Sequence, residues 1–297
     1  MVPQEALFPG FRVVRAPGAG AEVHAVVGGS GPPLLLLHGY AQTHALWHKV
    51  APRLARRFTV VAADLRGYGD SGKPATDANH EPYSKREMAK DAVALMAHLG
   101  HARFALAGHD RGARVSHRLA ADHPDAVTRV ALLDIAPTLA MYERTDMAFA
   151  RAYWHWFFLI QKAPIPETMI GHDPAGYLAF KMRDRGMGAD PFDPRAWAEY
   201  VRCFTPEAIH ATCEDYRAAA TIDLEHDRAD RDAGRKVECP LLALWGSRGV
   251  IEKCYDALAE WRRVAADVRG KSLPSGHYLP EEVPDLVADE FETFFSE

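Results

Sequence analysis

The residues with the clearest chemical potential lie in one short stretch, Gly108-His109-Asp110-Arg111-Gly112, between an apolar run and a helix-like run. A Gly-x-nucleophile-x-Gly turn between a strand and a helix exposes its central side chain at the edge of a sheet, because the glycines let the backbone fold without clashes. The centre of such a turn is often serine, but here it is aspartate. An ordinary strand-to-helix turn is the alternative, so the turn alone leaves its role open.

Two more residues could complete a catalytic set with Asp110. Folds that carry this turn order their catalytic residues as nucleophile, acid and histidine along the chain. Asp110, Asp134 and His277 follow that order, and each ends a predicted strand or follows one. Taken singly, Asp134 could cap a helix and His277 could be a turn histidine, but the joint pattern favours catalysis.

A carboxylate nucleophile determines which reaction such a set performs. Aspartate is already ionised at neutral pH, so Asp110 could attack a saturated carbon and form an alkyl ester. Water deprotonated by His277, which Asp134 orients, would then attack the ester carbonyl. The backbone N–H groups of Tyr40, in the sequence HGYAQ, and of Arg111 would form the oxyanion hole for this second step. Alkyl halides and epoxides are substrates for this chemistry.

Two arginines beside the nucleophile favour an anionic substrate. Arg111 and Arg114 lie three positions apart at the start of a predicted helix, so they share one face at the end that attracts anions. Their guanidinium groups would hold a carboxylate and offset its repulsion by Asp110. Solvated surface charges are the alternative, and Arg118, one turn further on, is expected at the surface.

A long aromatic segment offers donors for a leaving halide. An imidazole N–H, an indole N–H and a phenol O–H aimed at one point would stabilise the departing anion, and the candidates are His155, Trp156 and Tyr216. Packing between helices is the alternative explanation of the aromatic run. Phenols could instead protonate the oxygen of an opening epoxide, and this segment contains Tyr153, Tyr177, Tyr200 and Tyr216.

The order of predicted elements explains how these residues would be positioned. Strand signals occur at 22–29, 32–39, 58–65, 103–109, 128–135, 240–246 and within 266–280. Helical patterns lie between them at 43–57, 84–100 and 110–124. This alternation predicts an α/β fold with a mostly parallel sheet and helices on both faces. Residues 139–232 lack strand signals, so we expect a helical cap inserted into a core of residues 1–138 and 233–297.

Composition is that of an ordinary globular protein. The chain has 297 residues, 48% of them hydrophobic and 25% charged, with a formal net charge of −5. This balance does not indicate a nucleic acid or a membrane as partner. Four widely spaced cysteines without a CxxC pair do not indicate a metal site. No signal-peptide pattern or spanning apolar run is seen, so we expect a cytoplasmic location.

The chain resembles the fluoroacetate (haloacetate) dehalogenases, enzymes of the α/β-hydrolase fold, over nearly its full length. The motifs GHDRGAR, LLD, RAYWHW, DYRA and SGH carry the resemblance. The arginine pair of the first motif distinguishes this group from haloalkane dehalogenases and from epoxide hydrolases, which usually have tryptophan after the nucleophile. The resemblance implies a cofactor-free, metal-free homodimer with these site residues: Asp110 as nucleophile, His277 as base, Asp134 as its orienter, Arg111 and Arg114 for the carboxylate, and His155, Trp156 and Tyr216 for the halide.

Two departures from the family pattern bear on substrate size. The oxyanion loop, usually HGFPQ, contains Tyr40 and Ala41 here, and an expected tryptophan before FDP at 192–194 is replaced by the charged stretch KMRDRGMGADP with Arg183, Asp184 and Arg185. The predicted function is hydrolysis of a short 2-haloacid such as fluoroacetate or chloroacetate to glycolate and halide. Epoxide hydrolysis is the enzymatic alternative. A catalytically silent receptor is disfavoured, because a receptor does not need the base.

Overall fold

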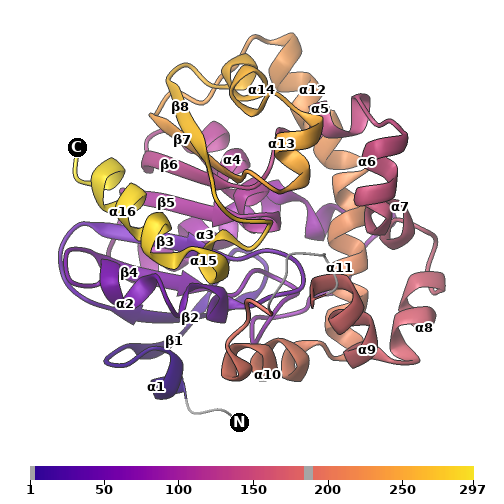
Figure 1. The fold of residues 1–297 in the computed structure, drawn as a ribbon, viewed down its shortest axis with the longest axis horizontal. Helices are drawn as coiled ribbons and strands as arrows, with labels where there is room; N and C mark the ends of the chain where they lie inside the picture. Colours follow the sequence, from indigo (N-terminus) through magenta and orange to yellow (C-terminus); the bar gives the residue numbers. More distant parts are fainter. Residues whose placement is uncertain (1–3, 184–189) are drawn as a thin grey trace.

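The computed structural model describes residues 4–183 and 190–297, which form one eight-stranded sheet in the order β1-β2-β4-β3-β5-β6-β7-β8 (Figure 1). Strand β2 runs antiparallel to its neighbours β1 and β4, and every other neighbouring pair is parallel. The predicted α/β fold with a mostly parallel sheet is therefore confirmed. The strands are β1 (Arg12–Pro17), β2 (Glu22–Gly28), β3 (Pro33–Leu37), β4 (Thr59–Ala63), β5 (Phe104–His109), β6 (Val127–Leu133), β7 (Leu241–Gly246) and β8 (Val268–Leu273).

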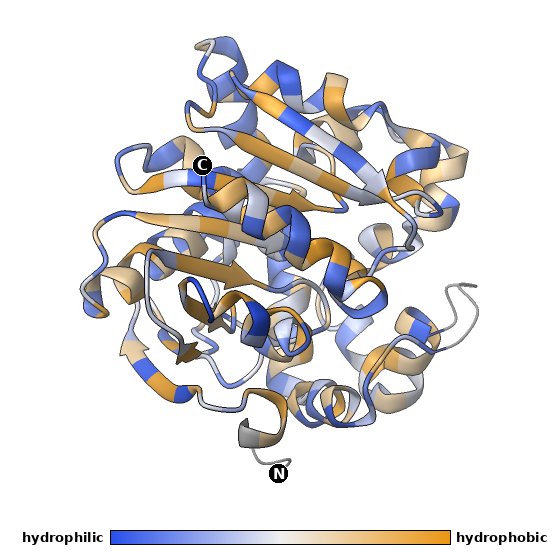
Figure 2. Cartoon of the chain, turned by 60° about the vertical axis from the view of Figure 1, so that its left-hand side comes forward, coloured by the Kyte–Doolittle hydropathy of each residue, from blue (hydrophilic) through white to orange (hydrophobic). Residues whose placement is uncertain are grey.

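The central strands are apolar along their whole length because both faces of the sheet are covered. One row of buried side chains crosses five strands, from Val61 through Leu35, Leu106 and Val130 to Leu241. Figure 2 shows the same strands as the most hydrophobic part of the molecule. Side chains from both faces of this sheet form the core that fixes the positions of the loops at its edge.

The edge strand β1 was not predicted from the sequence. Its burial alternates from Val13 onwards, with Val14 and Ala16 buried and Arg15 between them exposed, so it lacks the continuous apolar run of the central strands. Edge strands need only one buried face, and charged residues on the other face discourage pairing with further chains.

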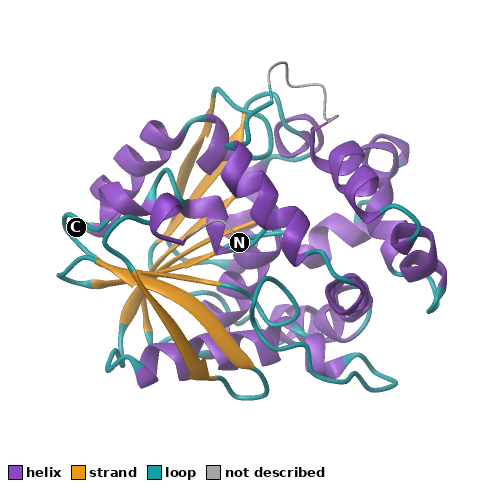
Figure 3. Cartoon of the chain, turned by 90° about the horizontal axis from the view of Figure 1, so that it is seen from below, coloured by secondary structure: helices purple, strands orange, loops and turns teal. Residues whose placement is uncertain are grey.

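Helices pack on both faces of the sheet (Figure 3). Figure 1 shows α2 (Ala51–Leu54), α15 (Leu279–Glu282) and α16 (Pro284–Phe295) in front of the sheet, with α3 (Lys85–His98) and α4 (Arg111–Asp122) behind it. The single helix expected over 43–57 is instead the short η1 (His44–Trp47) followed by α2, because Pro52 has no N–H to continue a helix and begins a new one. The other described helices outside residues 138–232 are α1 (Gln4–Leu7), η2 (Glu81–Tyr83), α13 (Val250–Cys254) and α14 (Ala257–Val264).

Between β6 and β7 the described residues form helices and no strand, as expected for residues 139–232. Figure 1 shows most of these helices gathered beside the sheet. They are α5 (Thr138–Glu143), α6 (Met147–Ala152), α7 (Trp154–Leu159), α8 (Ile165–Gly171), α9 (Pro174–Leu178), η3 (Ala179–Arg183), α10 (Pro194–Cys203), α11 (Pro206–Ala219) and α12 (Ile222–Asp232). None of the described helices combines the length and the apolar character that crossing a bilayer requires.

Candidate active site

The turn between β5 and α4 holds Asp110 in a strained conformation. Strand β5 ends directly before Asp110 and α4 begins directly after it, with φ 49° and ψ −114° at the aspartate itself. This backbone region costs a non-glycine residue on the order of 1–3 kcal/mol and is common at functional sites. A Cβ on Gly108 would lie 2.4 Å from the Gly112 carbonyl oxygen, and one on Gly112 would lie 2.3 Å from the His38 carbonyl oxygen. Both glycines are therefore needed for the close approach of the chain.

The structure brings Asp110, Asp134 and His277 together at the carboxyl ends of the strands. The Nδ1 atom of His277 donates to Asp134 Oδ2 at 2.5 Å, and its Nε2 atom lies 3.8 Å from Asp110 Oδ2. The other carboxylate oxygen of Asp134 accepts the Gly246 N–H at 2.9 Å. All three side chains are buried. Asp134 thus fixes the ring of His277 with Nε2 directed towards Asp110, which is the geometry of a base oriented by a carboxylate.

One oxygen of the Asp110 carboxylate is held by a backbone N–H group, and the surrounding charges favour its ionised form. The backbone N–H of Tyr40, in the loop after β3, donates to Asp110 Oδ1 at 2.8 Å. Burial alone would raise the pKa of this carboxyl group, but His277, His109 and the two arginines of α4 hold the pKa well below its usual range. Oδ1 is therefore fixed by the loop, while Oδ2 faces His277.

Arg111 is only partly available to a ligand. Its Nε donates to Asp215 Oδ2 at 2.9 Å and its Nη2 to the Asp215 carbonyl oxygen at 2.8 Å. The ring of Tyr216 lies against the same guanidinium, 4.1 Å from its carbon to the ring centroid. The remaining nitrogen, Nη1, is buried and has no hydrogen-bond partner among residues 4–183 and 190–297. Arg111 therefore offers one nitrogen to a substrate, and Asp215 sets its direction.

Asp215 was not among the site residues predicted from the sequence. This carboxylate also pairs with Lys85 and accepts the hydroxyl of Tyr68 at 2.5 Å. Burial raises its pKa, but Arg111 and Lys85 more than offset that effect and lower the pKa to about 2. Its place directly before Tyr216 in DYRA was the available signal, since a buried arginine beside the nucleophile needs a counter-charge.

Arg114 is anchored to the other side of the site. Its Nη1 donates to Thr138 Oγ1 at 2.9 Å and to the Ala136 carbonyl oxygen at 3.2 Å, and its Nη2 contacts Met141 Sδ at 3.1 Å. The Nε atom is buried and lacks a hydrogen-bond partner in the described part of the chain. The ring of Trp156 lies 4.7 Å from the guanidinium carbon. Both arginines are buried rather than solvated, and each leaves one nitrogen unpaired.

The three predicted halide donors gather around this pair. Trp156 Nε1 and the Tyr216 hydroxyl are buried without a hydrogen-bond partner among the residues described. The ring of Tyr216 lies 6.3 Å from that of Trp156 and 5.9 Å from that of His155, which is also buried. Unpaired buried donors are costly unless a ligand satisfies them, and one acceptor placed between Trp156 Nε1 and the Tyr216 hydroxyl would satisfy these two.

The prediction that Arg118 lies at the surface is wrong. Its side chain is 3% exposed and forms ion pairs with Asp122, Asp227 and Asp230 at 3.0, 2.8 and 2.5 Å. The last two residues belong to α12, so the carboxylates of that helix cover the Arg118 guanidinium. A helix that is covered along its length buries residues that periodicity assigns to a solvent face.

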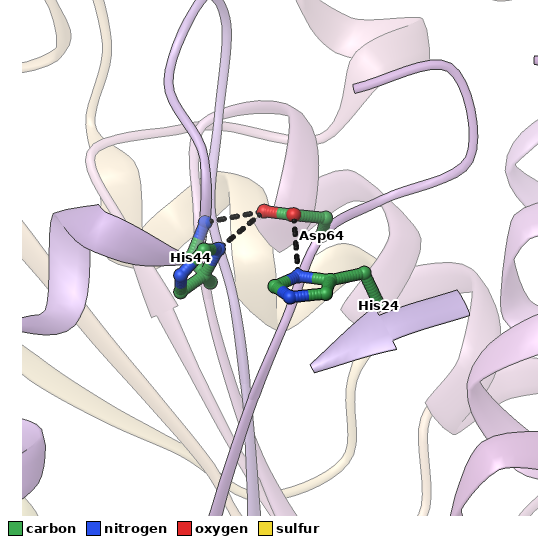
Figure 4. A group of neighbouring side chains, drawn as sticks. All are labelled: His24, His44 and Asp64. Carbon is green, nitrogen blue, oxygen red and sulfur yellow. Dashed lines mark hydrogen bonds and ion pairs between the residues drawn. The ribbon is translucent and has the colours of Figure 1, made fainter. Parts of the chain in front are cut away.

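A buried histidine cluster supports the loop that carries Tyr40. Figure 4 shows the rings of His24 and His44 pointing at Asp64. The Nδ1 atom of each ring lies 2.9 Å from a carboxylate oxygen of Asp64, and the backbone N–H of His44 donates to the same carboxylate at 2.7 Å. Burial would raise the pKa of Asp64, but His44 and the hydrogen bonds from both rings hold it well below its usual range. The carboxylate therefore accepts from both rings, and the cluster ties the segment after Tyr40 to the loop after β4.

Among the described residues, three groups of His, Cys, Asp and Glu side chains have the spacing of metal ligands, but their members form hydrogen bonds and ion pairs with one another or with arginines. These sets are His24, His44 and Asp64; Asp70, Glu199 and Cys203; and Glu167, His210 and Glu214. Arg202 binds both carboxylates of the second set, and Arg217 binds both carboxylates of the third. Hydrogen bonds and ion pairs thus account for these groups, and none of them includes Asp110.

A pocket of about 220 Å³ reaches the site from the side of His277. Asp134, Tyr153, Met182, Arg183 and Arg248 also line it. Asp184 and Arg185, where the sequence departs from the family pattern, lie outside the described residues. The other departure, Tyr40, donates its hydroxyl to that of Tyr177 at 3.1 Å. A larger pocket of about 410 Å³ between α4, α5, α12 and α14 contains none of the predicted site residues.

Comparison with known proteins shows which family this chain belongs to. Residues 32–282 match the family described as alpha/beta hydrolase fold, so the chain belongs to that family. The chain is 47% identical to a fluoroacetate dehalogenase of Burkholderia sp., over 98% of this chain and 96% of that protein. It is 35% identical to a soluble epoxide hydrolase of Corynebacterium sp. (strain C12), over 93% and 94% of the two chains. The structure of an alpha/beta hydrolase from Nostoc sp. PCC 7120 covers all of both chains with 54% identity and a TM-score of 0.95. The resemblance to fluoroacetate dehalogenases that the motifs predicted is confirmed.

Proposed function

We propose that the protein hydrolyses short 2-haloacids, such as fluoroacetate or chloroacetate, to glycolate and halide. The similarity to a fluoroacetate dehalogenase over nearly the full chain supports this function. The observation that carries it is the pair of buried arginines beside an ionised Asp110, in which Arg111 Nη1 and Arg114 Nε have no hydrogen-bond partner in the described chain. A substrate carboxylate would satisfy both atoms.

In the first step, Asp110 Oδ2 attacks the α-carbon of the haloacid. The carbon–halogen bond breaks, and an ester forms between Asp110 and the acid. Oδ2 is the attacking atom because Oδ1 already accepts the Tyr40 N–H. The halide leaves towards the donors Trp156 Nε1 and the Tyr216 hydroxyl, with His155 beside them, and their hydrogen bonds stabilise the charge that develops.

In the second step, water attacks the carbonyl carbon of the ester. His277 Nε2 takes the proton, and Asp134 holds the ring and stabilises the imidazolium that forms. The negative charge develops on Oδ1 of Asp110, to which the backbone N–H of Tyr40 already donates. The backbone N–H of Arg111 supplies the second donor of the oxyanion hole. Collapse of this intermediate restores Asp110 and releases glycolate.

The arginines favour haloacids over neutral epoxides. Arg111 Nη1 and Arg114 Nε are buried donors, and a neutral epoxide would leave both without a charged acceptor. The similarity to a soluble epoxide hydrolase keeps epoxide opening as the second candidate, since the nucleophile is common to both reactions. We assign no cofactor to either reaction, because each step uses only side chains, backbone N–H groups and water.

The domain division and the assembly belong to the same proposal. Residues 139–232 form the cap, and residues 1–138 with 233–297 form the core. Among the described residues of the cap, five large apolar side chains are exposed, which supports a homodimer that covers them: Met147, Trp154, Ile165, Met169 and Phe180. Light scattering of the purified chain tests this directly, and a monomer at micromolar concentration would refute it.

A halide-release assay with fluoroacetate, chloroacetate and the neutral epoxide styrene oxide tests the proposed function. We expect fluoride and chloride to be released and no diol to form. Diol from styrene oxide without halide from either acid would establish the epoxide alternative instead.

A further inference from the structure

The group of halide donors contains two chemically different members. An indole N–H such as that of Trp156 can donate a hydrogen bond but cannot give up its proton at accessible pH, whereas a phenol O–H can do both. A departing fluoride needs only hydrogen bonds. A departing alkoxide needs a proton, because it is far more basic than fluoride. The Tyr216 hydroxyl, buried and without a hydrogen-bond partner in the described chain, therefore offers more than halide release demands.

We propose that the same site hydrolyses epoxides that carry a carboxylate on the ring, with glycidate (oxirane-carboxylate) as the simplest, and that Tyr216 is the acid that protonates the opening oxygen. This inference rests on the proposed function, because it uses Asp110 as nucleophile and Arg111 with Arg114 as carboxylate site. Glycidate places an oxygen leaving group on its α-carbon, where fluoroacetate carries fluorine, and it has only one heavy atom more.

The atoms balance without any other reactant. Asp110 Oδ2 forms a bond to the α-carbon of glycidate, the bond from that carbon to the ring oxygen breaks, and the ring oxygen takes the proton of Tyr216. The ester is then hydrolysed by water with His277 as base, as in the haloacid reaction. The proton that His277 accepts returns to the Tyr216 phenolate through solvent. Glycidate and water thus give glycerate.

The surroundings of Tyr216 suit an acid for an alkoxide. The Arg111 guanidinium packs 4.1 Å from its ring and would stabilise the transient phenolate. Burial, and then the charge of Asp110, raise the pKa of Tyr216 well above its usual value. A phenol in this state stays protonated before the reaction, so its proton is available when the ring oxygen leaves. The charge of Asp110 also falls when it becomes an ester, at the moment when the phenolate forms.

The carboxylate requirement distinguishes this activity from general epoxide hydrolysis. Glycidol is the matched control substrate, because it has the same ring and replaces the carboxylate with a hydroxymethyl group. We expect kcat/KM for glycidate to exceed that for glycidol by about 100-fold or more, since charge-assisted contacts to two arginines are lost. In water labelled with heavy oxygen, the label accumulates on the α-hydroxyl of glycerate after many turnovers, because the ester forms at the α-carbon.

Two variants separate the acid from the hydrogen-bond donor. Tyr216→Phe is expected to lower kcat for glycidate by about 100-fold or more and kcat for fluoroacetate by about tenfold. Trp156→Phe removes a donor that has no proton to give, so it is expected to lower both rates by similar factors of about tenfold. A Tyr216→Phe variant that loses both activities equally would overturn the role of Tyr216 as acid.

The outcomes for the two proposals differ. Fluoride release from fluoroacetate without glycerate from glycidate would refute this inference and leave the proposed function intact. Absence of both fluoride and chloride release in the wild type would refute the proposed function itself. Glycerate labelled only on its β-hydroxyl would mean that the ring opens at the wrong carbon and would also overturn the inference.

Discussion

Asp215 accepts hydrogen bonds from two nitrogens of the Arg111 guanidinium, so the third nitrogen alone is left for a substrate. We expect Asp215→Asn to weaken this anchor and raise KM for haloacids by roughly tenfold, with a smaller change in kcat. Glu214→Gln makes the same chemical change one residue earlier, in an ion pair with Arg217, and should leave KM unchanged. Steady-state fluoride release measures both, and equal KM values for Asp215→Asn and the wild type would contradict this role.

Arg114 and Arg118 form a matched pair one turn apart on α4. Arg114→Ala is expected to raise KM for fluoroacetate by roughly 10- to 100-fold, because it removes a charged contact to the carboxylate. Arg118→Ala leaves Asp227 and Asp230 without their shared cation, so we expect a lower melting temperature and an unchanged KM. The account of the carboxylate site fails if the two variants exchange these phenotypes.

Glu281 makes stability depend on pH near neutrality. Burial raises its pKa from 4.5 to about 7, against the opposing effects of the Tyr200 hydrogen bond and of Lys49. The folded state therefore favours the protonated form, and this contribution is complete below about pH 4.5 and is lost as the pH rises through about 7. It amounts to about 3 kcal/mol at most.

Glu281→Gln keeps an acceptor for the Tyr200 hydroxyl and removes the titration. The wild type is expected to lose unfolding free energy relative to this variant between about pH 5 and about pH 8. Urea denaturation at both pH values measures the difference. If the unfolding free energy of the wild type instead rises relative to that of the variant as the pH rises, the ionised carboxylate of Glu281 is the form that the folded state favours.

Asp110→Asn tests the nucleophile without changing its shape. The amide can still accept the Tyr40 N–H, so we expect an unchanged fold by circular dichroism. Halide release should fall by about 1,000-fold or more, because a neutral amide is a very poor nucleophile. Release at the wild-type rate would remove Asp110 from the reaction.

The sequence predicted the framework of the site because local signals determine it. The glycines around Asp110, and the positions of Asp134 and His277 after apolar strands, follow from short motifs, and the structure places these residues together. Apolar runs likewise located the six inner strands, and the predicted stretch 266–280 contains the edge strand β8. Strand β1, at the opposite edge, was missed because it buries only Val14 and Ala16 and so contains no apolar run.

Ion pairs between residues far apart in the chain could not be predicted from local sequence patterns. The Asp215 carboxylate meets Arg111 across 104 positions, and α12 covers Arg118 through residues more than a hundred positions away. No local pattern encodes which helix of the cap packs against α4. For the same reason, Arg118 was expected at the surface, and Arg111 and Arg114 were assigned the same role although each has a different anchor.

The central claim is that Asp110 becomes covalently bonded to the α-carbon of the substrate. His277→Asn keeps a polar side chain beside Asp134 but lacks the base, so the ester should form and not be hydrolysed. After incubation with fluoroacetate, mass spectrometry of the peptide that contains Asp110 should show the mass of one added carboxymethyl group, and the Asp110→Asn/His277→Asn double variant should show none. An unmodified Asp110 peptide in the His277→Asn variant, from a protein whose wild type releases fluoride, would contradict the account.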